Sequence, residues 1–236
     1  MKKFLSVVLC ISLLICSSIL VYADEFSYNY GISPKLIERE QNLLSEIESN
    51  LDEIHAQIAE YQQNTIQPRG VQYGGFQYLD GDILVTKSTI LWGLTGHAGI
   101  LVGDKVLEIT PTYNNGVPAA IPMATWFSRY PETMVVRYNG ERDIPVDAAW
   151  YGHTFYVNGA GADNEYSLVS SLTSLDKDYC SSLVWKCYHY GANFDYEVLD
   201  GGTLEWTIPV TILPYDFIMD GYYQHNNFSI VHSVNW

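Results

Sequence analysis

Positively charged side chains are scarce in this sequence. Twelve Lys and Arg residues stand against 27 Asp and Glu residues, which gives a formal net charge of −15 at pH 7. A chain this acidic lacks the basic surface that attracts nucleic acids or anionic membrane surfaces, so we expect no nucleic-acid partner. With 236 residues, 47% of them hydrophobic, the chain is long and apolar enough for one ordinary domain with extensions.

Several chemical signatures are also missing. The sequence has no His-Glu-x-x-His, no Cys-x-x-Cys pair and no His/Cys cluster at metal-ligand spacing, so we expect no metal site. It has no Gly-x-Ser-x-Gly elbow and no phosphate-binding glycine loop. We therefore expect no cofactor, and we look for the chemistry elsewhere.

The N-terminus has the pattern of a secretory signal. Lys2 and Lys3 precede an apolar run over residues 4–21, and the small residue Ala23 follows. We expect residues 1–23 to be a signal peptide cleaved near Ala23, which predicts a secreted, extracellular (cell-envelope) protein. The alternative is a retained membrane anchor, because the run is just long enough to span a bilayer.

The sequence has four cysteines, and two of them lie in the expected signal peptide. Cys10 and Cys16 leave with that segment, so the mature chain keeps Cys180 and Cys187. If both lie on one helix, seven residues at ~1.5 Å rise place them about 10 Å apart. That separation exceeds the ~7 Å limit between Cα atoms for a disulfide. A thiol that stays free in an oxidising compartment suggests catalysis.

Residues 24–64 are expected to form a short leader and one long helix. Ser33 and Pro34 have the residue types of a helix start, and the segment that follows has no further Gly or Pro up to Asn64. Apolar residues recur every seven positions, with the polar Glu40 interrupting the stripe. The stripe either packs on the catalytic domain or forms a coiled-coil homodimer or a partner-binding stalk.

The rest of the chain predicts a linker and one mixed domain. Residues 65–80 hold Pro68 and several glycines, which is typical of a linker. Within 81–236 we expect a helix from Cys180 to Tyr190 and a short one over Val146–Tyr151. The expected strands are Ile83–Thr86, His97–Val102, Val106–Thr110, Met134–Tyr138, Thr154–Val157 and Phe228–Val234.

Cys180 is the candidate nucleophile. The segment from Asp178 to Cys187 predicts a helix whose first turn holds Cys180. The dipole and free N–H groups of a helix start favour a thiolate and can also hold an oxyanion. The alternative is a buried structural cysteine, and we assign that role to Cys187 two turns later.

His97 is the candidate base, and Glu108 its partner. His97 opens an apolar run that ends at the turn Gly103-Asp104-Lys105, after which a strand returns. If the loop is 104–105, Leu101 faces Glu108; if it is 103–104, Gly99 does. In both registers Glu108 projects on the same face as His97, where it can orient the imidazole. The small residues after His97 would leave room for a substrate.

The other histidines fit this role less well. His153 and His232 lie beside or within expected strands and are the reserve bases. His55 and His225 are expected at the surface. His189 would point away from the thiol, because nine residues of helix turn it to the opposite face.

These motifs resemble a known family. The residues Gly81-Asp82-Ile83-Leu84 and Gly96-His97-Ala98-Gly99-Ile100, followed far downstream by Tyr179-Cys180-Ser181-Ser182-Leu183-Val184, resemble the permuted papain-like amidases of the YiiX/YaeF type. These are relatives of NlpC-type cell-wall peptidases and of lecithin–retinol acyltransferase. The resemblance covers residues 81–236.

The resemblance implies an α+β fold and a reaction. The fold would be a circularly permuted papain-like (NlpC-like) domain with a central antiparallel sheet and a Cys-bearing helix, preceded here by the long N-terminal helix. Cys180 would be the nucleophile, His97 the base and Glu108 the third residue, although the acyltransferase relatives place a His there. Tyr179 is a candidate for the oxyanion site.

Three functions follow as hypotheses. The first is a secreted cysteine amidase or peptidase that cleaves an amide or peptide bond, in cell-wall peptides outside the membrane. The second is a lipid-ester acyl hydrolase or acyltransferase, with Trp92, Trp126 and Trp206 lining an acyl groove or, alternatively, filling the core. The third is a non-catalytic surface-interaction protein, suggested by the long helix.

Overall fold

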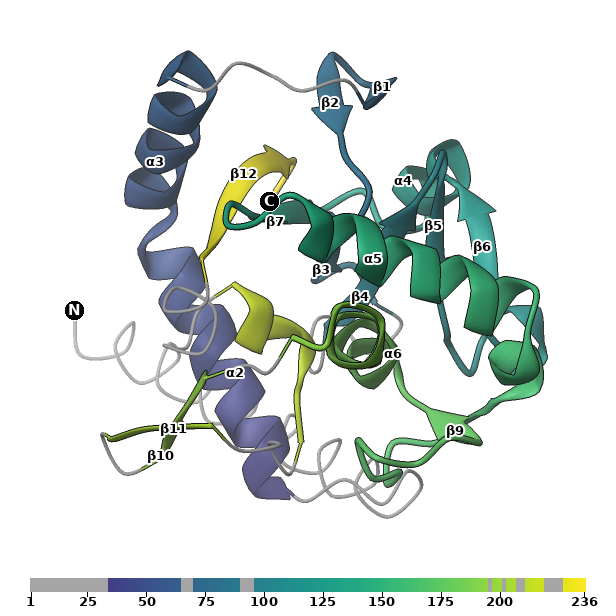
Figure 1. Ribbon diagram of the computed structural model, residues 1–236. Helices are drawn as coiled ribbons and strands as arrows, with labels where there is room; N and C mark the ends of the chain where they lie inside the picture. Colours follow the sequence, from purple (N-terminus) through teal and green to yellow (C-terminus); the bar gives the residue numbers. More distant parts are fainter. Residues whose placement is uncertain are drawn as a thin grey trace.

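The computed structural model describes residues 34–64, 70–89, 96–194, 197–200, 203–206, 211–218 and 227–236 (Figure 1). The expected signal peptide and leader lie outside these residues. Among the described residues, no helix has the length and apolar character needed to cross a bilayer. The described part of the chain has the expected α+β architecture.

A six-stranded antiparallel sheet forms the centre of the molecule, as predicted. Its order is β12-β7-β3-β4-β5-β6, and every neighbouring pair is antiparallel. The strands are β3 (Ile83–Thr86), β4 (His97–Val102), β5 (Lys105–Glu108), β6 (Ala119–Pro122), β7 (Thr133–Tyr138) and β12 (Phe228–Val234).

Alternation along the strands gives the sheet two apolar faces. Ala98 and Ile100 point into the larger core, which α5 (Asp143–Tyr151) and α6 (Cys180–Lys186) cover (Figure 1). Leu101 points into a smaller core on the other face, which contains Trp126 of α4 (Met123–Arg129). His97, the first residue of β4, therefore lies at the boundary between these layers.

The long N-terminal helix forms as two consecutive helices, α2 (Pro34–Ser49) and α3 (Leu51–Asn64), seen as one bent rod in Figure 1. The interruption falls at Asn50, where the side chains of Ser49 and Asn50 both donate to the carbonyl of Glu46. Such local bonds compete with the regular helical ladder and bend helices.

The apolar stripe of these helices packs on the same chain. Ile47, Ile54 and Ile58 are buried in the larger core, and Gln62 Nε2 donates to the Val231 carbonyl of β12 at 3.0 Å. This is the first of the two arrangements that the stripe allows. A homodimer or a partner protein that binds these helices would have to contact another face of them. Such an interaction remains a prediction.

Two segments differ from expectation. Residues 71–78, inside the expected linker, form the hairpin β1 (Val71–Tyr73) and β2 (Phe76–Tyr78), turned by Gly74 and Gly75 at positive φ. The expected strand Thr154–Val157 is instead a π-helical turn, η2 (Gly152–Val157), that continues α5. A four-residue β-branched and aromatic run does not distinguish a strand from a buried helix segment.

Candidate active site

Cys180 is the first residue of α6, as predicted. The preceding residue Tyr179 is extended, at φ −120° and ψ 169°, and Ser182 Oγ accepts the Tyr179 N–H at 2.8 Å. This side-chain cap begins the helix at Cys180. The thiol is 6% exposed and forms no disulfide, and the backbone N–H groups of Ala98 and Ser181 donate to it.

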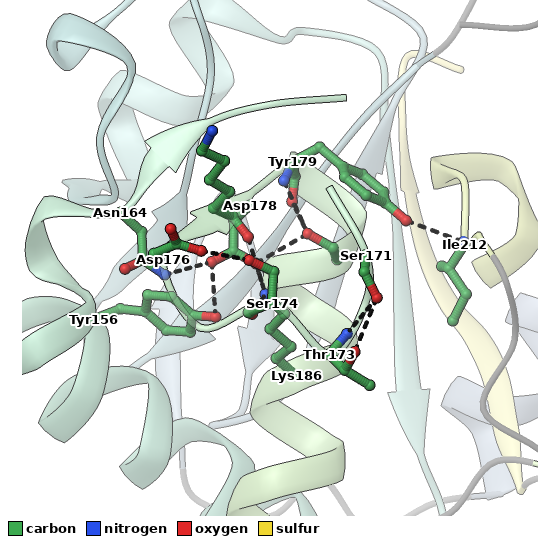
Figure 2. Close-up of polar contacts among 12 residues, drawn as sticks. Tyr156, Asn164, Ser171, Thr173, Ser174, Asp176, Asp178, Tyr179, Lys186 and Ile212 are labelled. Atoms are coloured by element: carbon green, nitrogen blue, oxygen red, sulfur yellow. Dashed lines mark hydrogen bonds and ion pairs between the residues drawn. The ribbon is translucent and has the colours of Figure 1, made fainter. Parts of the chain in front are cut away.

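A buried polar network holds the segment before Cys180 (Figure 2). Asp178 Oδ1 pairs with Lys186 Nζ at 2.8 Å, and both side chains are fully buried. The other carboxylate oxygen accepts Tyr156 Oη at 3.1 Å and Asn164 Nδ2 at 2.8 Å. Lys186 also donates to two backbone carbonyls. Because buried charges are stable only when fully partnered, this network fixes the approach to the nucleophile.

His97 connects Cys180 to Glu108. Its Nε2 lies 2.7 Å from Glu108 Oε2, so Nδ1 is the nitrogen that hydrogen bonds to Cys180. Burial acts to lower the pKa of His97, but the hydrogen bonds and charges of Cys180 and Glu108 outweigh it and raise that pKa to about 9. The imidazole is therefore protonated at neutral pH.

The pKa of Cys180 is lowered, whereas that of His97 is raised. Burial acts to raise the pKa of Cys180, but the hydrogen bond and charge of His97 and the N–H groups of Ala98 and Ser181 outweigh it, so the pKa falls below its ordinary value. A protonated His97 beside a Cys180 thiolate is the ion pair that activates a cysteine nucleophile.

The register of β4 and β5 decides between the two predicted alternatives. Ile100 pairs with Leu107 and Val102 with Lys105, which makes residues 103–104 the loop and places Gly99 opposite Glu108. Glu108 and His97 then share a face of the sheet, as both alternatives required.

Glu108 has two partners that sequence reasoning missed. Arg129 Nη1 lies 2.9 Å from Glu108 Oε1, and the Tyr130 hydroxyl also hydrogen bonds to this carboxylate. The Arg129 guanidinium in turn covers the Tyr113 ring at 4.0 Å. No spacing in the sequence links Arg129 to Glu108, because α4 folds back over β5 only in three dimensions.

The space beside His97 is filled, contrary to expectation. The Trp126 ring is fully buried and stacks on the imidazole, with 5.4 Å between ring centroids. A Cβ atom at Gly99 would lie 2.9 Å from that ring, so the glycine accommodates Trp126 rather than a substrate. Trp126 is thus a core residue. Trp92 and the side chain of Trp206 lie outside the described residues.

Tyr179 is tied to the segment before η5 (Pro214–Phe217). Its hydroxyl accepts the Ile212 N–H at 3.3 Å, and the side chain is buried (Figure 2). Its oxyanion role remains a prediction. Cys187 is fully buried with a pKa raised by burial and by the charge of Asp178, which fits its expected place in the core.

The remaining histidines lie elsewhere. His55 and His153 are exposed, and His189 stacks on Trp185. His232 stacks on Phe76 with 4.2 Å between ring centroids, and its pKa is lowered by burial and by Arg137. His225 lies outside the described residues. His97 is the histidine that the fold brings to Cys180.

The structure pairs a free cysteine with a histidine and a carboxylate beside an antiparallel sheet. Thiol-dependent acyltransferases and hydrolases use such an arrangement. The model of the LnsA-like lipoprotein N-acylation protein family matches residues 53–222, and the chain belongs to this family. The match places it among the YiiX-like and lecithin–retinol acyltransferase-like acyltransferases and hydrolases that the sequence motifs resemble.

Two individual proteins are also similar. An uncharacterized 30.3 kDa protein of Bacillus thuringiensis is 28% identical over 135 residues, which are 54% of this chain and 49% of that protein. The chain thus spans about half the length of this curated relative. The crystal structure of metalloprotein yiiX from Escherichia coli O157:H7 is 21% identical, with a TM-score of 0.38, over 50% of this chain and 69% of the other.

Proposed function

We propose that this protein transfers acyl groups through a thioester on Cys180. The observation that carries the proposal is the Cys180–His97 pair at the start of α6, with Glu108 Oε2 2.7 Å from the far nitrogen of the imidazole. Cys180 is the nucleophile, His97 the proton carrier and Glu108 the residue that orients His97. The lowered pKa of Cys180 supports attack as the thiolate.

The reaction has two balanced halves. The Cys180 thiolate attacks the acyl carbonyl carbon, a C–S bond forms, and the bond to the leaving alkoxide or amine breaks as His97 gives it a proton. An acceptor amine or water then attacks the thioester, His97 takes a proton from it, and the thiolate leaves. The same residues serve an ester or an amide donor.

For the substrate we favour a lipid ester as acyl donor and an amine as acceptor. The description of the family as lipoprotein N-acylation proteins supports this choice over the cell-wall amide that the sequence motifs suggested. The expected signal peptide would place the reaction outside the membrane. We further propose that the domain is a permuted papain-like fold, since the strand with His97 precedes the helix with Cys180.

Mass spectrometry of the intact protein tests the proposal. After incubation with a diacyl phospholipid, we expect a mass increase of one acyl chain that hydroxylamine removes and that peptide mapping places on Cys180. Cys180→Ala should abolish the adduct, and Cys187→Ala is the matched control that should keep it. An adduct that persists in Cys180→Ala would refute the mechanism. Adducts from cell-wall peptides, but none from lipids, would assign the amide substrate instead.

A further inference from the structure

Arg129, the last residue of α4, is held by two side chains. Its Nη1 donates to Glu108 Oε1 at 2.9 Å, and its guanidinium lies over the Tyr113 ring, 4.0 Å from the ring centroid. The Arg129 side chain is 27% exposed, whereas that of Glu108 is 2% exposed. The guanidinium therefore brings a permanent positive charge from the protein surface to a buried carboxylate.

Residues in and just after α4 also enclose the histidine–carboxylate pair. Trp126 and Tyr130 pack on the His97 imidazole, with 5.4 Å and 4.9 Å between ring centroids. The Tyr130 hydroxyl hydrogen bonds to Glu108. Because these rings are buried, charges at this place act on one another more strongly than at the surface. Within the described part of the chain, the charged partners of Glu108 are His97 and Arg129.

Arg129 completes the charge balance of the site. In the resting enzyme the Cys180 thiolate balances the His97 imidazolium, and Glu108 balances Arg129. Once the thiolate has become a thioester, a neutral His97 leaves Glu108 and Arg129 as a complete ion pair. Without Arg129, a neutral His97 would leave a buried carboxylate with no cation, which is costly. A proton would then stay on the His97–Glu108 pair.

We propose that Arg129 is a positioning residue for acyl transfer, whose permanent charge beside Glu108 lets His97 give its proton to the leaving group and stay neutral until the acceptor attacks. The inference rests on the proposed acyl transfer. In the second half of that reaction, the acceptor nitrogen or oxygen bonds to the acyl carbon and His97 takes its proton. The C–S bond then breaks, and its electron pair leaves on the thiolate. An imidazolium cannot take that proton.

This role predicts the direction in which the titration of His97 moves. Of the two groups that raise the pKa of His97, the Cys180 thiolate disappears on acylation and Glu108 remains. Arg129 offsets the Glu108 charge, so its removal should shift the titration of His97 to higher pH. Arg129→Gln keeps a hydrogen-bond donor without the charge, whereas Arg129→Lys keeps the charge. The two variants therefore separate charge from orientation.

The first measurement needs no substrate. In the full-length mature protein with Cys180→Ala, which removes the thiolate as acylation does, the isotope-labelled imidazole of His97 is titrated by NMR. The signal missing from His97→Asn identifies it. We expect Arg129→Gln to raise the midpoint by about one pH unit or more, and Arg129→Lys to leave it near that of the parent. Arg142→Gln, at an exposed position, is the matched control and should not move it.

The second measurement follows both halves of the reaction with Cys180 in place. With 4-nitrophenyl octanoate, the burst of nitrophenol reports acylation and the steady state reports release of the acyl group to water. We expect Arg129→Gln to change the burst little, because nitrophenolate leaves without a proton. Acyl release at pH 7 should fall about tenfold or more and recover as the pH is raised. Arg129→Met replaces Arg129→Gln if thermal melting shows the latter to be unfolded.

The outcomes separate the two proposals. An unmoved His97 midpoint in Arg129→Gln would overturn the role of Arg129 and leave the thioester mechanism standing. Equal losses of acyl release in Arg129→Gln and Arg129→Lys would also overturn it, because the guanidinium would then act by its shape and not by its charge. If the wild type forms no acyl-enzyme, the acyl-transfer proposal fails and the role of Arg129 in acyl release fails with it, whatever the His97 midpoint does.

Discussion

Glu108 holds His97 with one carboxylate oxygen and Arg129 with the other, at 2.7 Å and 2.9 Å. The carboxylate is 2% exposed, so both contacts are shielded from water. One cation is the imidazolium that Cys180 needs, and the other is a permanent guanidinium from α4. Glu108 therefore does more than orient an imidazole, because its charge helps to keep His97 protonated.

Glu108→Gln should lower kcat/KM about ten- to a hundredfold, the cost of a charge-assisted hydrogen bond of ~1.5–3 kcal/mol. The Glu108 charge raises the pKa of His97, which stands at about 9, so its loss should move the alkaline limb of the pH–rate profile to lower pH. Steady-state rates between pH 5 and pH 10 check both effects. An unchanged alkaline limb would show that Glu108 only fills space.

The pH dependence of alkylation tests the thiolate directly. The pKa of Cys180 is lowered by His97 and by two backbone N–H groups, so iodoacetamide labelling should reach its plateau well below the ordinary thiol midpoint of ~8.5. His97→Ala should move that midpoint upward, because only the two backbone N–H groups then oppose the effect of burial. Peptide mass spectrometry reads both cysteines. Cys187, with a raised pKa, should label only after unfolding.

Much of the sheet was predictable because local pattern and tertiary role agree. The predicted limits of β3, β4 and β12 match the structure, since each is a short apolar run bounded by residues that favour turns. The helix start at Cys180 was predictable from the apolar positions that follow it. The partner Glu108 followed from strand alternation alone, which is why both possible registers gave the same answer.

The residues that the sequence could not reveal depend on contacts distant along the chain. Arg129 meets Glu108 across 21 positions, and Glu40 meets Tyr215 across 175. Glu40 was visible only as the polar interruption of an apolar stripe, a position that is solvated in many amphipathic helices. Glu40 is buried beside residues 211–218, which lie far away in the sequence, so no local pattern could predict its burial.

The Asp178–Lys186 pair should be strongly coupled. Lys186→Met leaves the fully buried Asp178 carboxylate unpaired, which should cost about 3–5 kcal/mol in free energy of unfolding. The double variant Asp178→Asn/Lys186→Met should recover part of that loss, because neither charge remains. Urea denaturation of the two single variants and the double variant measures the coupling. Strictly additive losses would show that the two side chains stabilise the protein independently.

Gly99→Ala tests whether close packing, rather than open space, is what the site requires beside His97. The added methyl group would lie 2.7 Å from Val106 Cγ1 and 2.9 Å from the Trp126 ring, so we expect a loss of about 1–3 kcal/mol in unfolding free energy. Because Trp126 stacks on His97, displacement of the indole should also slow alkylation of Cys180.

Trp126→Phe in the Gly99→Ala background supplies the matched test. The smaller ring makes room for the methyl group, so the double variant should lose less stability than the sum of the two single changes. Urea denaturation and the alkylation rate are measured on the same four proteins. The contrary result is that Gly99→Ala changes neither the free energy of unfolding nor the alkylation rate. That result would show that the space over Gly99 is open to a substrate and that Trp126 does not position His97.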